Sequence, residues 1–377
     1  MKRFILLLMI VIIGYVSKPL WEEPVQQFVP SSVGDSIQSA VDSIKDNPDI
    51  NSVIGTLNQQ LNALFANIDN FSSESNDTNV KTPELSVPED QTFSIHNIEL
   101  GDSKAEVEQE AGEPQRISEN EYGVNWAAYH DNYENFIMVA YGEENSVRGL
   151  YTNQDLIASS TGIKQGSDKQ LVREKLGTPE SSIRKGLTNY RINSNGEYDV
   201  FRLDNSYITV FYDKHENNTV AAIQIIGEKL EQNKNAFYTK PNEELKEGLE
   251  YQLFDLTNAS RAKYDLPILT WDNDARNTAR GHSSDMAENQ YFSHVNLQGE
   301  SPFDRMREDN IRFYSAGENL AYGQFSSIFA HQGLMNSLGH RKNILREDYE
   351  YLGVGVAFNN ESQPYYTETF FSGPSVS

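Results

Sequence analysis

The combination of an export-type N-terminus with a complete lack of cysteine constrains this chain most. Met1-Lys2-Arg3 places two positive charges before an unbroken apolar run from Phe4 to Val16, which is the pattern of a secretory signal or a signal anchor. Exported domains are commonly stabilised by disulfides, and none can form in 377 residues without cysteine. Each domain must therefore be held by core packing alone, and the length leaves room for two or three domains.

The apolar run predicts either a retained membrane anchor or a cleaved signal peptide. As a helix it would span about 20 Å, short of the roughly 30 Å hydrocarbon core of a bilayer, and extending it to Trp21 includes Lys18 and Pro19. No small-x-small cleavage motif follows Gly14. We therefore favour an uncleaved anchor at residues 1–21 and an extracytoplasmic, membrane-anchored protein, with secretion after cleavage as the alternative.

The charge balance limits the partners. Lys and Arg number 31 against 55 Asp and Glu, which gives a formal net charge of −24. Such a surface repels nucleic acid and anionic lipid headgroups. We expect no nucleic-acid partner and a solvated acidic surface.

Composition divides the remainder of the chain. Residues 22–91 are poor in aromatics, show only weak helical spacing of apolar residues, and end in a stretch of Ser, Asn, Thr, Pro and acids. They predict a stalk or linker, partly helical or disordered. Residues 229–245 are hydrophilic and are expected to join a domain at 92–228 to a second domain at 246–377.

An internal repeat organises the first of these domains. Four residues recur with identical spacing at an offset of 65: Gly101, Val107, Gly112 and Pro114 return as Gly166, Val172, Gly177 and Pro179. Each copy predicts a short helix (104–111 and 168–176) ended by Gly-x-Pro. Two strands follow each helix, at 136–141 and 147–151 in the first copy and at 207–212 and 220–226 in the second. We expect a small α+β domain of two tandem helix-plus-hairpin repeats.

The last third of the chain holds three polar clusters, at 291–294, 317–320 and 337–341. Helices are predicted before them at 242–264 and 274–289. Four of the seven histidines lie in this third: His282, His294, His331 and His340. Two imidazoles and a carboxylate in one pocket could hold a divalent metal or move protons.

Residues from about 248 to 373 carry an ordered series of motifs: Leu256-Thr257-Asn258-Ala259-Ser260-Arg261, Tyr291-Phe292-Ser293-His294, Gly317-Glu318-Asn319-Leu320-Ala321, Ser337-Leu338-Gly339-His340-Arg341 and Leu352-Gly353-Val354-Gly355-Val356. Through these motifs the segment resembles the bacterial branch of the CAP superfamily, which groups cysteine-rich secretory proteins, insect venom allergens and plant pathogenesis-related proteins. The region ahead of it resembles the CAP-associated N-terminal domain of bacterial proteins.

The resemblance implies an α-β-α sandwich with a large central cleft. His294 and Glu318 match the two best-preserved cleft positions, and His340 matches the second histidine of bacterial forms. These three are the candidate ligand-facing or metal-facing residues, with zinc as the possible metal. His282, Asn319 and Tyr365 are expected to support them.

The chain departs from the eukaryotic pattern at several positions. Ser337 and Leu334 stand where a glutamate and a tryptophan are expected, and Tyr365 stands where a histidine is expected. Half of the eukaryotic His/Glu set is therefore missing. Elsewhere we expect His331 to be exposed, and Arg305 to pair with Asp304 and Arg261 with Asn258.

Two functions remain open at this point. The favoured one is a non-enzymatic protein whose His/Glu-lined cleft binds a ligand of the cell envelope: a lipid, a peptide or a glycan. The alternative is a hydrolase in which His294, Glu318 and His340 surround a metal-activated water. No Gly-x-Ser-x-Gly or His-Glu-x-x-His motif occurs, and replacing Glu318 with Gln is expected to leave the fold of a binding protein nearly intact.

Overall fold

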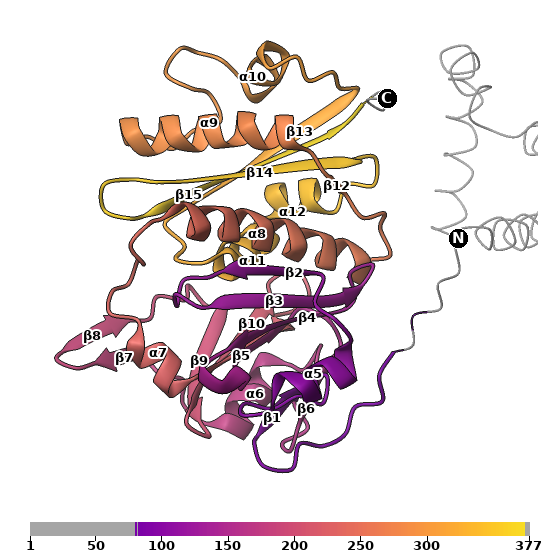
Figure 1. Cartoon of the computed structure of the whole chain (residues 1–377), viewed down its shortest axis with the longest axis vertical. Coiled ribbons are helices and arrows are strands. Elements are labelled where there is room, and N and C mark those ends of the chain that lie inside the picture. Colours follow the sequence, from indigo (N-terminus) through magenta and orange to yellow (C-terminus); the bar gives the residue numbers. More distant parts are fainter. Residues whose placement is uncertain (1–79, 81, 374–377) are drawn as a thin grey trace, which may run out of the picture. The chain divides into compact units, whose positions relative to one another are not determined.

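The computed structural model describes residue 80 and residues 82–373 (Figure 1). The expected anchor at 1–21 and nearly all of the expected stalk lie outside the described residues. Among the helices of the described part, none is long and apolar enough to cross a membrane. From Val80 onward the chain forms one compact unit.

The first half of this unit is built on one antiparallel sheet. Its seven strands follow the order β2 (Arg116–Glu119), β3 (Asn125–Asp131), β4 (Glu134–Tyr141), β5 (Val147–Thr152), β11 (Thr219–Gly227), β10 (Ser206–Asp213) and β9 (Tyr198–Leu203). Both expected hairpins are present, as β4–β5 and β10–β11. The pairing of β5 with β11 joins the two sets of strands into a single sheet.

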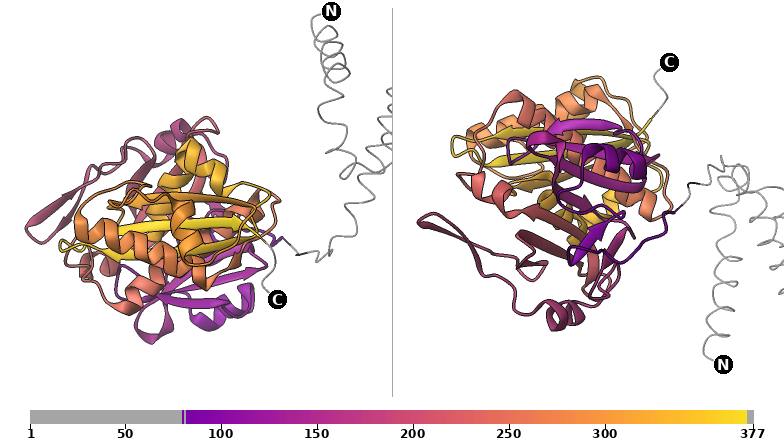
Figure 2. Two further views of the ribbon diagram at one scale, coloured as in Figure 1. Left: turned by 90° about the horizontal axis from the view of Figure 1, so that it is seen from above. Right: turned by 60° about the horizontal axis from the view of Figure 1, so that its bottom comes forward.

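The two helices of the predicted repeat occupy the expected ranges. Helix α5 (Lys104–Ala111) begins at a capping box on Ser103, and α6 (Lys169–Leu176) begins after Asp168. Gly112 and Gly177, which end them, have φ of +77° and +88°, a region that favours glycine. Three further pieces complete this half: the pair β1 (Phe93–Ile95) and β6 (Ile157–Ser159), the short helices η2 (Glu143–Asn145) and α7 (Glu228–Asn233), and the hairpin β7 (Ser182–Lys185) with β8 (Thr188–Arg191). The hairpin extends away from the sheet (Figures 1 and 2).

Both faces of the seven-stranded sheet are buried. Along β4, Ile137 and Val139 belong to a core shared with α5, α6 and β1. Their neighbours Phe136 and Met138 point to the other face, into a core shared with the second half of the chain. Because side chains alternate between the faces of a strand, burial of both faces explains the nearly continuous apolar run at 136–140.

The second half is an α-β-α sandwich, as the resemblance implied. Its four-stranded sheet has the order β12 (Thr270–Trp271), β14 (Tyr351–Phe358), β15 (Pro364–Ser372) and β13 (Ser315–Tyr322). On one side of this sheet lie α9 (Asn273–Asn289) and α10 (Pro302–Glu308). On the other side lie α8 (Glu243–Lys263), α11 (Ser327–Asn336) and α12 (Leu338–Ile344) (Figure 1). The α+β fold class is thus confirmed.

Close approach of α9 to β14 requires glycine in the strand. A Cβ atom on Gly353 would lie 2.2 Å from the backbone nitrogen of Arg276, and one on Gly355 would lie 2.1 Å from that of Arg280. No real side chain fits at such distances. The Gly-Val-Gly spacing, with period two, places both glycines on the face that meets α9.

Helix α8 connects the two halves. One of its sides packs on the four-stranded sheet, and the other reaches β2 and β4 of the seven-stranded sheet. Asp255 of α8 accepts a hydrogen bond from Tyr133 (2.9 Å) and pairs with Arg116 (2.9 Å). A single apolar core includes Trp126 from the first half and Leu253 from α8. The division at 229–245 stays a prediction, and α7 and the first turn of α8 fall largely within it.

Candidate functional site

The candidate site is built on the edge strand β13 and the segments that cover it. Glu318 lies on β13, and His294 lies in the loop between α9 and α10. His340 is on α12. The structure also brings in Arg305 from α10. The His294 loop and α10 therefore both reach the carboxylate that β13 carries.

Glu318 is the centre of a closed set of contacts. Its Oε1 lies 2.8 Å from Nδ1 of His294, and its Oε2 accepts a hydrogen bond of 2.6 Å from Nη2 of Arg305. The side chains of Glu318 and Arg305 are 3% and 9% exposed. Both carboxylate oxygens thus have N–H partners in a nearly dry environment, where charge-assisted hydrogen bonds are strong.

His294 is held in one orientation by this carboxylate. An ionised carboxylate can only accept, so the proton between the two atoms belongs to Nδ1 of His294. The imidazole is 51% exposed, which leaves Nε2 available as an acceptor when the ring is neutral. The site therefore offers one oriented, accessible hydrogen-bond acceptor above a buried ion pair.

Two more histidines lie around the pair. Nε2 of His282 donates to the carbonyl oxygen of Ser293 (2.9 Å), next to His294 in the chain. Burial lowers the pKa of His282, and nearby Glu318 raises it in part. Burial also lowers the pKa of His340, and the neighbouring His294 lowers it further. His282 thus lies near Glu318 and His340 lies near His294, whereas His294 is the histidine that bonds to Glu318.

Asn319 and Tyr365 take different places. Asn319 donates to the Glu368 carboxylate (3.0 Å) and to the carbonyl oxygen of His340 (3.2 Å), which ties β13 to β15 and α12. Tyr365 is buried in a small apolar core, with its ring 4.3 Å from the ring of Tyr322. Asn319 can position the site, whereas Tyr365 acts through packing.

The donor arrangement does not fit a metal centre. Within residues 80 and 82–373, no three His, Asp or Glu side chains are grouped closely enough to hold a metal ion. Glu318, the expected carboxylate ligand, already has a guanidinium on one oxygen and an imidazole N–H on the other. Zinc coordination by Glu318 would have to use a lone pair that these contacts leave, on a side chain that is only 3% exposed.

Exposed apolar side chains lie on the same elements as the pair. They lie on the elements that carry the site: Phe292, Val295 and Leu297 in the His294 loop, Phe303 on α10, Tyr322 on β13 and Leu338 on α12. The rings of Phe292 and Tyr322 are 5.9 Å apart. Exposed apolar patches of this kind often mark interaction sites.

Several expectations for polar residues are wrong. Arg305 pairs with Glu318 and not with Asp304. Asp304 instead caps α10 together with Ser301 and pairs with Arg307. Asn258 and Arg261 do not pair with each other: each bonds to backbone groups elsewhere, Asn258 at Leu269 and Arg261 at four carbonyls.

His331 is also placed differently from the expectation. It is fully buried, its Nε2 lies 2.7 Å from Oγ of Ser260, and burial lowers its pKa to about 3. Its helical spacing from Ile328 and Leu334, which are themselves buried, was the signal that could have indicated this.

Comparison with known proteins gives family matches for both halves. Residues 100–237 match the family described as CAP-associated N-terminal, and residues 254–371 match the cysteine-rich secretory protein family. The "uncharacterized membrane protein YlbC" of Bacillus subtilis is 30% identical over 288 residues, which cover 72% of this chain and 82% of that protein. The "uncharacterized protein YkwD" of the same organism is 40% identical over 121 residues, covering 32% of this chain and 46% of that protein.

Two solved structures are similar over most of the described residues. An extracellular protein containing an SCP domain from Bacillus anthracis aligns with a TM-score of 0.63 at 26% identity, covering 78% of this chain and 99% of that one. A cysteine-rich secretory protein from Staphylococcus aureus aligns with a TM-score of 0.60 at 16% identity, covering 77% and 96%. The second likeness concerns the fold alone.

Proposed function

This chain belongs to the cysteine-rich secretory protein (CAP) family and carries the CAP-associated N-terminal domain ahead of its CAP domain, and from that premise we propose that it is a non-enzymatic, ligand-binding protein of the cell envelope. Its ligand has an apolar body and a hydrogen-bond donor. Of the lipid, peptide and glycan classes, a lipid with a hydroxyl or amide head fits the exposed apolar side chains best.

The closed contact set of Glu318 is the observation that carries this proposal. Both oxygens of Glu318 are engaged, one by Arg305 and one by His294, which favours a carboxylate that holds these two side chains in place over one that acts as a general base. The same contacts orient His294 so that Nε2 can accept a hydrogen bond from a ligand. The apolar side chains on the neighbouring segments would cover the rest of that ligand.

Retention at the membrane is the second part of the proposal. It is supported by the apolar run from Phe4 to Val16 after two positive charges. It is also supported by the Bacillus subtilis relative, whose name describes a membrane protein. The extracellular Bacillus anthracis protein supports a location outside the cytoplasm. The run itself lies outside the described residues.

The test is to purify the full-length chain from membranes and identify co-purifying small molecules by mass spectrometry. Leu338→Gln, on α12 two residues before His340, is compared with Ile117→Gln on β2, since each native side chain is just over half exposed. Leu338→Gln should lose one apolar contact with the ligand and bind it about 1.5 kcal/mol, roughly tenfold, more weakly, whereas Ile117→Gln should not. Equal retention by both variants would contradict the proposed surface. Stoichiometric zinc together with a hydrolytic activity, both lost in His294→Gln, would replace the proposal with the metal-dependent hydrolase.

A further inference from the structure

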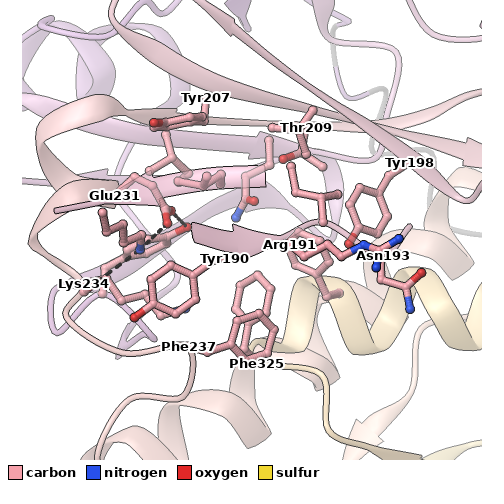
Figure 3. Close-up of a pocket in the computed structure, with 18 of the residues that line it drawn as sticks. Tyr190, Arg191, Asn193, Tyr198, Tyr207, Thr209, Glu231, Lys234, Phe237 and Phe325 are labelled. Carbon is pink, nitrogen blue, oxygen red and sulfur yellow. Dashed lines mark hydrogen bonds and ion pairs between the residues drawn. The ribbon is translucent and has the colours of Figure 1, made fainter. Parts of the chain in front are cut away.

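A cavity of about 160 Å³ lies between the two halves of the chain, in a different place from the site of His294 and Glu318 (Figure 3). Its walls come from the hairpin β7–β8, strands β9 to β11, Tyr122, α7 with its Glu231 and the residues after it, and the segment of Phe325 and Phe329. None of the residues that line it belongs to the candidate site described above. The cavity therefore exists only where the CAP-associated domain and the CAP domain meet.

One wall is a set of packed rings. Phe329 of α11 lies edge-on to Tyr198, with ring centroids 5.2 Å apart, and Phe325 lies 4.5 Å from Phe329. Phe237 packs against Phe325 at 5.3 Å, and Tyr207 closes another part of the lining. Rings fixed by one another in this way form a preorganised apolar surface.

The two lysines of the cavity have different partners. Lys185 is paired with Glu231 at 2.5 Å, and Glu231 also accepts a hydrogen bond from Tyr122 (2.9 Å). Lys234 is almost fully buried, and in the described part of the chain it makes no ion pair. Its Nζ lies 4.0 Å from the ring centroid of Phe325. Burial lowers its pKa despite the charges of Glu121 and Glu231 nearby, so an additional anion would stabilise its ammonium.

A second donor in the lining is unsatisfied within the described residues. Gln224 of β11 is 2% exposed, and its buried Nε2 makes no hydrogen bond to any residue that the structure describes. An unsatisfied buried amide costs about 1–3 kcal/mol, so such a group marks a place where an acceptor is missing. Arg191, at the exposed end of the lining, adds a further positive charge.

From these observations we propose that the cavity binds a small organic carboxylate that carries one ring or one branched apolar group. The carboxylate accepts from Lys234 and Gln224, and the apolar group lies against Phe325 and Tyr198. The volume agrees with this size, because a cavity of about 150 Å³ is known to hold one benzene ring. This chemistry is shared by free aromatic or branched acids and by the C-terminal residue of a peptide.

The decisive comparison uses the unsubstituted full-length chain in detergent and isothermal titration calorimetry. Phenylacetate should bind, and phenylacetamide, which has the same ring but no charge, should bind about tenfold more weakly or not at all. Equal affinity of acid and amide, or no heat from phenylacetate at millimolar concentration, would overturn the proposal. N-acetyl-Gly-Gly-Phe with a free C-terminus separates the two sources: tighter binding than phenylacetate indicates a peptide end, and weaker binding indicates a free acid.

Variants locate the binding in this cavity. Lys234→Met removes the charge and keeps the length, and it should weaken phenylacetate binding about tenfold or more. Lys169→Met is the matched control, because Lys169 also lies over a ring, that of Tyr212 at 4.6 Å, but does not line the cavity. Unchanged affinity in Lys234→Met, or an equal loss in Lys169→Met, would place the binding elsewhere. If Lys234→Met does not fold, Gln224→Leu replaces it, and unchanged affinity there would count against the proposal in the same way.

Discussion

The buried pair of Arg305 and Glu318 gives the sharpest prediction. Arg305→Met removes the guanidinium and keeps an apolar stem, which leaves Glu318 as a buried carboxylate with His294 as its remaining partner. Breaking a buried ion pair from one side costs about 3–5 kcal/mol. The same substitution removes the hydrogen bonds from Nη1 of Arg305 to the carbonyls of His294 and Glu300 (2.9 and 3.1 Å). We expect the free energy of unfolding to fall by about 4 kcal/mol.

Glu318→Gln should also be costly, although sequence alone suggested little effect. The amide keeps the size of the side chain, but it leaves the guanidinium of Arg305 buried without an anion. We expect a loss of about 3 kcal/mol. The double variant should lose much less than the sum, with a coupling energy of about 2–3 kcal/mol, because neither charge is then left alone.

The assay is urea unfolding at pH 7 followed by tryptophan fluorescence, carried out on all four members of the cycle. The matched control is the pair Arg346 and Asp348, which lie 2.5 Å apart with both side chains about half exposed. Exposed pairs couple by about 0–1 kcal/mol. A coupling energy for Arg305 and Glu318 no larger than that of the surface pair would refute the view that this carboxylate is locked in a buried ion pair.

Two further predictions concern the fold around the site. Burial raises the pKa of Glu368 to about 7, and Asn319 and Thr257 lower it only in part. The native state therefore holds a proton that the unfolded state releases above about pH 4.5. The contribution of Glu368 to the free energy of unfolding falls as the pH rises from there towards 7, by about 3 kcal/mol in total. Glu368→Gln should remove that part of the pH dependence, measured as urea stability at pH 5 and pH 8; an unchanged difference between the two pH values would contradict it. Gly355→Ala should prevent α9 from packing on β14, because the new Cβ would lie 2.1 Å from the backbone of Arg280. Gly281→Ala, on the open side of α9, should raise the free energy of unfolding by about 1 kcal/mol and so raise the thermal midpoint. Equal midpoints for the two variants would show that the contact is not tight.

Local signals in the sequence were sufficient to predict individual helices and strands. The Gly-x-Pro ends predicted α5 and α6, because glycine at a helix end adopts positive φ and proline cannot continue the helix. The apolar runs predicted β4, β5, β10 and β11. Ordered motifs were sufficient to indicate the CAP fold, and they named His294 and Glu318, which the structure places in contact. The roles of these residues in binding stay a prediction.

The tertiary structure decided which polar groups meet. Arg305 and Asp304 are adjacent in sequence, yet α10 directs Arg305 to Glu318 across 13 residues, because a helix points neighbouring side chains in different directions. His331 is polar by type, but it is buried because α11 is enclosed between the two halves of the chain. The cavity around Lys234 has walls from both halves and no motif of its own. Periodicity and capping act within one element and can be read along the chain, whereas burial and ion pairing depend on segments that only folding brings together.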